Sequence, residues 1–223
     1  MLTNIYNKIR KGEVAFSPKI HNSVILKIYL AKGIDLLRGF CKLQKRYVFC
    51  GKNCVFDQKR YIKCGNWLNI ANNVYINGLS ENGILLGHNV SIGKYTCIEG
   101  SGSLGFLGKG FVCGNNCGLG THSFYGCAGG IEIGNDVIVG NYVSMHSENH
   151  NFSDKDRPIR LQGVNHKGIK IGNNCWIGAK ATILDGAIIG NGCVVAAGAV
   201  VTEQFPDDVV IGGIPAKILK QRC

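Results

Sequence analysis

A six-residue repeat constrains the fold of this chain more than any other feature of its sequence. Residues 171–206 divide into six consecutive units, IGNNCW, IGAKAT, ILDGAI, IGNGCV, VAAGAV and VTEQFP, and every unit begins with Ile or Val. The fifth residue is small in five of the six units: Cys175, Ala181, Ala187, Cys193 and Ala199. A period of six is neither the 3.6 of an α-helix nor the alternation of a simple strand. It indicates a short strand followed by a turn of about 120°, repeated along the chain.

The same frame recurs upstream, with shifts of register that indicate inserted loops. Its residues lie six apart in three blocks: Leu86 and Ile92; Cys113, Leu119 and Tyr125; Ile133, Val139 and Met145. Weaker units begin near Cys50 and Ile70. Three units close a triangular coil of about eighteen residues, and stacked coils bury their apolar residues only against their neighbours. We therefore predict an all-β parallel β-helix over residues 48–223. The first residue of each unit points inward, the fifth sits at a corner, and Gly, Asn and Asp supply the turns.

Composition and charge limit the function classes that remain. The net charge is +11, which indicates either an anion-binding surface or diffuse solvent-exposed lysine. No zinc-finger spacing or aromatic RNA-binding signature is present, so we expect no nucleic-acid partner. The eleven cysteines form no CxxC pairs, and the N-terminal residues lack the apolar stretch of a signal peptide. We expect buried, reduced thiols and a cytoplasmic protein.

Residues 1–47 lie outside the repeat, and we expect them to form a mostly helical segment. Residues 23–44 predict a helix with Lys27, Lys32, Arg38 and Lys42 on it, whose apolar residues could share one side: Ile25, Ile28, Tyr29, Leu36, Leu37, Phe40 and Leu43. Such a helix could cap the open end of the β-helix, as repeat proteins require. It could also lie on the inner membrane surface as a basic amphipathic helix. No run is long enough to span a membrane.

The repeat is interrupted once by a long polar stretch. Met145 and Ile171 are 26 residues apart, two more than a multiple of six, so residues 146–168 are predicted to leave the β-helix as a loop. The loop carries His146, His150 and His166. Histidine is the usual base for acyl transfer to a hydroxyl, because its pKa lies near working pH. Glu148 and Asp154 are the nearby carboxylates that could orient an imidazole, and the sequence leaves the choice open.

The repeats, the run NHNFSDKDRPI followed by IGNNCWIGAKATIL, and the ending IGGIPAKILK resemble the hexapeptide-repeat acyltransferases, in particular the sugar and polysaccharide O-acetyltransferases. The resemblance covers about residues 48–222 and implies a left-handed β-helix, a homotrimer with active sites between subunits, and acetyl-CoA as donor. It places His150 as the general base, with His146 as the second candidate for that role or as a residue that lines the site and binds the acceptor. Glu148 is a candidate partner of His150 by its nearness in sequence. His122 stands where relatives often carry Asn near the acceptor, so it either binds the acceptor or is structural.

The same resemblance implies a coenzyme A site beside the last coils. Trp176, Ala179, Ala197 and Thr202 would line the pantetheine arm, and Lys217 and Lys220 would lie near the phosphates. A lysine commonly follows the Thr of V-V-T, but this chain has Glu203 there, which removes one phosphate contact. The implied function is acetylation of a sugar hydroxyl in surface polysaccharide biosynthesis, with no resident metal.

Three alternatives remain open at this point. The chain could N-acetylate a nucleotide-linked amino sugar, because the motifs do not separate the two acceptors. It could be a zinc enzyme similar to the γ-class carbonic anhydrases, with His122, His146 and His150 as ligands, although their spacing is a poor match. It could also be a β-helix that binds without catalysis.

Overall fold

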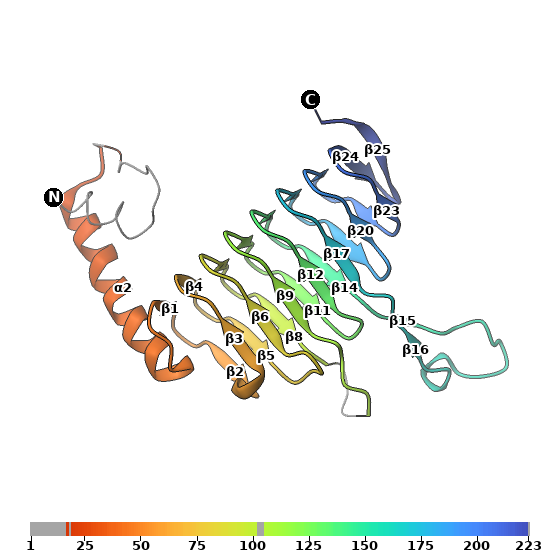
Figure 1. The fold of residues 1–223 in the computed structure, drawn as a ribbon, viewed down its shortest axis with the longest axis horizontal. Coiled ribbons are helices and arrows are strands. Elements are labelled where there is room, and N and C mark those ends of the chain that lie inside the picture. Colours follow the sequence, from red (N-terminus) through yellow and green to blue (C-terminus); the bar gives the residue numbers. More distant parts are fainter. Residues whose placement is uncertain (1–16, 18, 102–104, 223) are drawn as a thin grey trace.

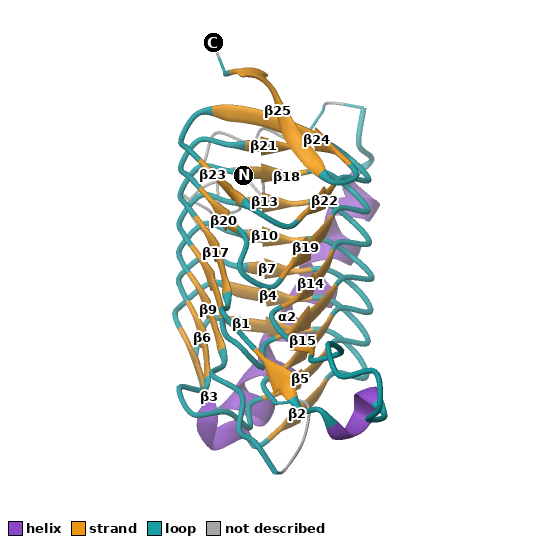
Figure 2. Ribbon diagram, turned by 90° about the vertical axis from the view of Figure 1, so that its right-hand side faces the viewer, coloured by secondary structure: helices purple, strands orange, loops and turns teal. Residues whose placement is uncertain are grey.

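A computed structural model describes residues 17, 19–101 and 105–222, and shows a triangular parallel β-helix preceded by one long helix (Figure 1). The predicted segment 1–47 therefore lies partly outside the described residues. Three sheets form the three faces of the prism, and each coil contributes one short strand to each face in the order A, B, C (Figure 2).

The three faces consist of the following strands, in spatial order. Face A comprises β1 (Val48–Cys50), β4 (Leu68–Ile70), β7 (Ser91–Ile92), β10 (Gly118–Leu119), β13 (Ile138–Val139), β18 (Trp176–Ile177), β21 (Val194–Val195), β24 (Val209–Gly213) and β25 (Ala216–Gln221). Face B comprises β2 (Val55–Asp57), β5 (Tyr75–Asn77), β8 (Cys97–Glu99), β11 (Phe124–Gly126), β14 (Ser144–His146), β19 (Thr182–Leu184) and β22 (Val200–Val201). Face C comprises β3 (Ile62–Cys64), β6 (Ile84–Leu86), β9 (Phe111–Cys113), β12 (Ile131–Ile133), β17 (Ile169–Ile171), β20 (Ile188–Ile189) and β23 (Gln204–Phe205). A 3₁₀ turn, η1 (Lys59–Tyr61), precedes β3.

The repeat frame predicted the interior of the prism correctly. Ile171, Ile177, Ile183 and Ile189, the first residues of four successive units, are all buried. The small residues at the fifth position of these units are buried too: Cys175, Ala181, Ala187 and Cys193. Burial raises the pKa of the Cys175 thiol to about 11, so this thiol stays protonated and packs as a small apolar group. All ten cysteines among the described residues are free thiols.

The corners differ from one another, and this difference positions the functional residues. At the C–A corner, stacked asparagines satisfy the turn amides: the N–H of Asn135 donates to Asn173 Oδ1, and that of Asn173 to Asn191 Oδ1, each at 2.8 Å. At the A–B corner, Tyr95, His122 and Tyr142 stack with centroid distances of 4.8 and 4.9 Å. The chain connects β14 to β17 at the B–C corner, where the long loop leaves the prism.

Helix α2 (Asn22–Leu43) is capped at its N-terminus by His21, whose side chain accepts a hydrogen bond from the N–H of Ser23. At its C-terminus it is capped by Gln44, which has the left-handed backbone conformation. Its C-terminal half lies against β1, where Gly39 is buried against Val48. The predicted helix is present, but the expectation of a single apolar side is wrong. Ile25 is buried, whereas Leu37 and Phe40 are 68% and 55% exposed on the outward side. Among the described residues, no helix is both long and apolar enough to cross a bilayer.

Candidate functional site

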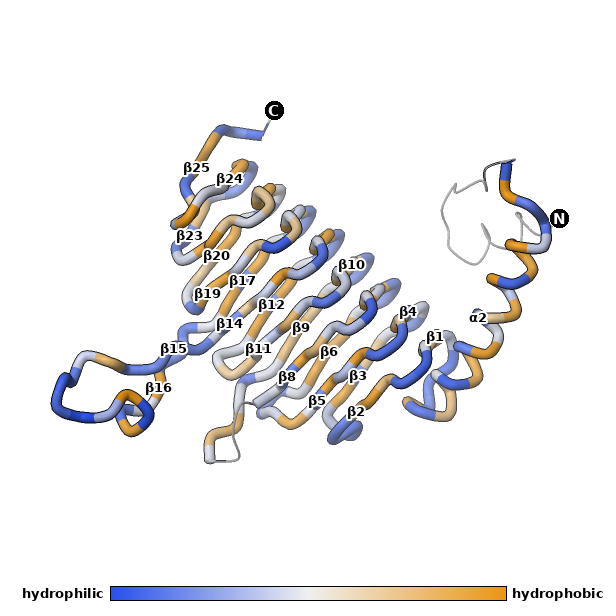
Figure 3. Tube along the Cα trace, turned by 180° about the vertical axis from the view of Figure 1, so that it is seen from behind, coloured by the Kyte–Doolittle hydropathy of each residue, from blue (hydrophilic) through white to orange (hydrophobic). Residues whose placement is uncertain are grey.

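The histidine-bearing loop forms a short antiparallel ribbon that projects from the B–C corner (Figure 1). Strand β15 (Asn149–His150) pairs with β16 (Val164–Asn165), so that His150 stands opposite Val164. The loop thus begins and ends where the break in the six-residue frame predicts. It is mainly hydrophilic, unlike the coils (Figure 3).

Side-chain amides stabilise the outer part of the loop. Gln162 Nε2 donates to the carbonyl oxygens of Asp154 and Arg157, both at 2.7 Å, and Asn165 Nδ2 donates to Asn151 Oδ1 at 2.7 Å. The turn η2 (Ile159–Leu161) lies between these contacts. These bonds give the segment beyond His150 a defined conformation.

Asp185 anchors the base of the loop to the prism. Its carboxylate is only 8% exposed, and it accepts hydrogen bonds from the N–H groups of Lys167 and Gly168, each at 2.8 Å to Oδ1. It also lies 3.4 Å from Asn149 Nδ2, beside His150. Asp185 therefore connects both strands of the ribbon to the coil beneath it.

His150 is exposed, and the two candidate carboxylates face other groups. Glu148 Oε2 lies 3.7 Å from Nδ1 of His166, whose ring also contacts Phe106 at 4.8 Å between centroids. Asp154 Oδ1 accepts from the N–H of Asp156. Among the described residues, no hydrogen bond or ion pair joins His150 to either carboxylate. The catalytic roles of His150 and Glu148 stay predictions.

His146 and Thr202 lie on the same corner as the loop. His146 ends β14 and is exposed, with its Nε2 2.7 Å from Ser144 Oγ and its ring 5.5 Å from that of Phe124. Thr202 directly follows β22, two strands along face B from β14. We call His146, His150 and Thr202 the B–C site.

Most residues predicted to bind the cofactor lie on a different part of the prism. Trp176, 55% exposed, is in register with Val194, then Val210, then Lys220 across face A. With strands about 4.8 Å apart, this strip places the indole and the lysine about 14 Å apart along the prism. We call Trp176, Val194, Val210 and Lys220 the face A strip.

Ala179 and Ala197 are exposed at the A–B corner, immediately beside the face A strip. The N–H of Gly198 donates to the Ala179 carbonyl at 2.9 Å, so the two alanines lie on successive coils. His122 is on this same corner, between Tyr95 and Tyr142, with a left-handed φ of 55°. The structure therefore places His122 with the cofactor residues and away from His146 and His150.

The two groups of predicted residues lie on opposite edges of face B. The chain crosses this face between Ala179 and Leu184, which at about 3.3 Å per residue separates the edges by about 16 Å. Within one chain, His150 therefore stands apart from Trp176, Ala179 and Ala197.

Lys217 lies in β25 with Lys220, at the same end of the molecule. Its Nζ lies 3.8 Å from Glu203 Oε1, and both side chains are more than half exposed. Glu203, which stands where the related proteins commonly carry a lysine, therefore forms an ion pair with Lys217. Such an exposed pair is weak and leaves the ammonium available to another anion.

Sequence reasoning did not find the role of Asp185 or the partly buried position of His166. Asp185 occupies an ordinary turn of the repeat unit ILDGAI, where an aspartate is typical of the turn itself. Asp185 also holds the base of the loop, and it can do so only because the loop returns onto this turn. The His166 ring contacts Phe106, which approaches from a different inserted loop.

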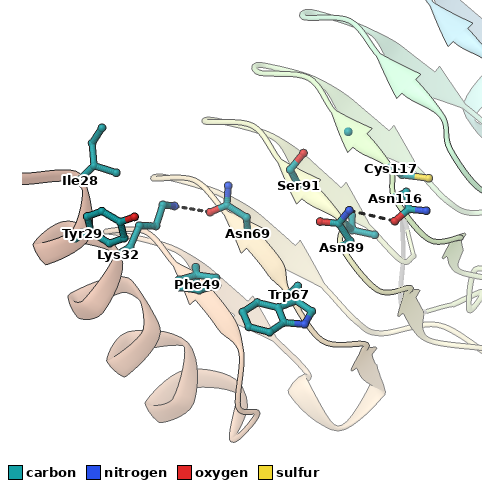
Figure 4. A pocket seen from close by; sticks show the side chains of 12 residues that line it. Ile28, Tyr29, Lys32, Phe49, Trp67, Asn69, Asn89, Ser91, Asn116 and Cys117 are labelled. Carbon is teal, nitrogen blue, oxygen red and sulfur yellow. Dashed lines mark hydrogen bonds between the residues drawn. The ribbon is translucent and has the colours of Figure 1, made fainter. Parts of the chain in front are cut away.

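A separate cavity of about 260 Å³ lies between α2 and the beginning of face A (Figure 4). Phe49, Trp67 and Lys32 line it, and Lys32 Nζ donates to Asn69 Oδ1 at 2.6 Å. The cavity contains none of the predicted site residues. It shows that the N-terminal half of α2 stands off from the prism.

Within residues 17, 19–101 and 105–222, no three His, Cys, Asp or Glu side chains come together as a potential metal site. His122 lies on the A–B corner and His146 on the B–C corner, so one chain does not bring the three candidate histidine ligands together.

The chain is similar to several known proteins in sequence and in structure. Residues 168–203 match the family described as "Bacterial transferase hexapeptide (six repeats)". Over 92 residues the chain is 38% identical to a probable acetyltransferase of Mycobacterium tuberculosis, covering 41% of this chain and 31% of that protein. Over 98 residues it is 35% identical to a putative lipopolysaccharide biosynthesis O-acetyl transferase, WbbJ, of Escherichia coli, covering 41% of this chain and 50% of the relative. The chain thus spans half or less of the length of these relatives.

Among solved structures, an N-acyltransferase, AntD, of Bacillus cereus in complex with dTDP and coenzyme A superposes with a TM-score of 0.58 at 21% identity. The superposition covers 78% of this chain and 86% of that one. The likeness supports the fold, and the predicted left-handed parallel β-helix is confirmed. Residues 168–203 thus match the bacterial transferase hexapeptide repeat, and the resemblance to the hexapeptide-repeat acyltransferases is confirmed.

Proposed function

We propose that this protein transfers an acetyl group from acetyl-CoA to a sugar hydroxyl, at sites formed between copies of the chain in a homotrimer. One observation carries this proposal: the B–C site lies at one edge of face B, and Ala179 and Ala197, with the face A strip beside them, lie at the opposite edge, about 16 Å away. Each chain then offers one half of the site at one edge and the other half at the opposite edge. A cyclic trimer, in which one edge meets the other edge of the next copy, brings the halves together.

The face A strip fits an extended, polyanionic thioester. Trp176 offers an exposed apolar surface, and the alanines at the A–B corner leave the backbone accessible. Lys220, in register at the far end, supplies a positive charge for phosphates, with Lys217 beside it. Thr202 would contact the same donor from the neighbouring copy.

His150 would act as the general base. Its imidazole accepts the proton of the sugar hydroxyl while the oxygen forms a bond to the thioester carbonyl carbon. The carbonyl becomes an oxyanion, which N–H donors must stabilise. When the C–S bond breaks, the imidazolium returns the proton to the departing thiolate. His146 and His122 would contact the acceptor from the two edges of the site.

The names of the relatives support the proposed acceptor class. WbbJ is named for lipopolysaccharide biosynthesis, which supports a surface-polysaccharide unit or its precursor as acceptor. The free thiols are typical of the cytoplasm, where we propose that the protein works.

The test is release of coenzyme A thiol from acetyl-CoA in the presence of candidate sugars, with wild-type protein and with His150→Ala. We expect the variant to lose at least about 10²-fold in kcat, the usual contribution of a general base. Its melting temperature and trimer should be unchanged, because His150 is exposed. His21→Ala, outside the site, is the control. Full activity in His150→Ala would contradict the assignment.

A further inference from the structure

The outward side of α2 carries a continuous row of exposed apolar side chains. Five residues form it, with exposed fractions from 52% to 68%: Leu26, Leu30, Ile34, Leu37 and Phe40. Their spacing of four and three residues aligns them along one side of the helix. No charged residue falls within the sector they span. We call these five residues the α2 ridge.

Among the described residues, the opposite side of α2 contacts the coils. Gly39 packs on Val48, Arg38 Nη1 donates to the Cys50 carbonyl at 3.0 Å, and Lys42 Nζ donates to the Cys54 carbonyl. The ridge therefore lies on the side of α2 that faces away from the coils. Figure 1 shows α2 at the N-terminal end of the prism. Contiguous exposed apolar surface of this kind marks an interaction site.

Charge around the α2 ridge distinguishes between possible partners. Residues 19–52 contain eight Lys or Arg residues and one acidic residue, Asp35. Asp35 is neutralised within the fold, since its carboxylate lies 2.8 Å from Arg38 and 3.6 Å from Lys32. The residues at the margins and ends of the ridge, Lys19, Lys27, Lys45 and Arg46, are exposed and have no ion pair among the described residues. An apolar strip bordered by unpaired cations complements an anionic lipid surface.

We propose that the α2 ridge inserts into the interface of a bilayer containing anionic lipids and holds the protein at the membrane surface. The helix lies in the interface and does not cross it, in agreement with the absence of a spanning helix among the described residues. The inference is independent of the acetyl transfer proposed above.

The full-length protein is sedimented with vesicles of phosphatidylcholine alone or mixed with phosphatidylglycerol. Wild-type protein is expected to bind the mixed vesicles and to dissociate as salt is raised. The variant Leu30→Glu/Leu37→Glu is expected to lower the partition coefficient at least about tenfold, because each glutamate would be buried in the interface. The matched control is Val112→Glu/Ile188→Glu, which makes the same change at exposed positions on face C and should bind as wild type.

A second variant keeps the α2 ridge intact. Lys27→Glu/Lys45→Glu should fold and should lose binding to the mixed vesicles, which separates membrane binding from a folding defect in the first variant. Three results would overturn the proposal: no binding of wild type to the mixed vesicles, unchanged binding of Leu30→Glu/Leu37→Glu, or dissociation of the oligomer by that variant with vesicle binding retained. The last result would make the ridge an interface between copies of the chain.

Discussion

Asp185 connects the loop that carries His150 to the repeat through two backbone N–H groups. The N–H groups of Lys167 and Gly168 point to its carboxylate, and Asn149 approaches the same group from the strand that carries His150. The repeat pattern predicts that Asp185 lies in a turn. The sequence also predicts the limits of the loop and points to His150 as the candidate base. It does not predict the contact, because the partners are 17 and 18 residues away and meet only after the loop returns.

Asp185→Ala should leave these N–H groups without their acceptor, at a cost of about 1–3 kcal/mol in the free energy of unfolding. Under the proposed function, kcat should fall because His150 is less well positioned, while KM for acetyl-CoA should change little. Thermal unfolding and steady-state kinetics measure both effects. Asp185→Asn keeps one acceptor oxygen and should recover part of each loss. Wild-type values of kcat and melting temperature in Asp185→Ala would refute this positioning role.

Helix α2 shows where sequence patterning is ambiguous at the level of an element. The apolar residues of 23–44 were expected to share one side, but the structure distributes them over two. The reason is that Gly39 makes the close contact with the prism, and a glycine carries no apolar signal in a sequence. The coils were predictable because every unit obeys the same steric rule, whereas a single helix has no repeat to fix its orientation.

The two glycines of α2 provide a matched prediction. A Cβ on Gly39 would collide with the backbone of Val48, while a Cβ on Gly33 would meet nothing within 4 Å. Gly33→Ala should stabilise the protein by about 0.4–1 kcal/mol through helix propensity and reduced freedom of the unfolded chain. Gly39→Ala should destabilise it by about 1–3 kcal/mol, because α2 must move away from β1. Denaturant unfolding of the two variants checks the signs, and the same sign in both would contradict the described seating of the helix.

At the scale of the whole molecule, the arrangement of the predicted residues matters more than their identities. Sequence motifs identified His150, Trp176 and Lys220 as candidate site residues, but they did not indicate which corner or face of the prism each would occupy. The number of residues per coil decides this, and the inserted loops shift it, so it becomes visible only in the folded prism. His122 illustrates the point, since it lies on the corner with Ala179 and Ala197 and two rings stack on it.

The central claim is that two copies of the chain complete each active site, and complementation between inactive variants tests it most directly. His150→Ala and Trp176→Ala are each purified, then unfolded, mixed in equal amounts and refolded together, and thiol release from acetyl-CoA is measured with a sugar acceptor. Random assembly into trimers should give about a quarter of the interfaces an intact His150 facing an intact Trp176, and about a quarter of wild-type activity. Each variant refolded alone should stay inactive. Activity in the mixture no greater than that of the separate variants would contradict a site shared between copies.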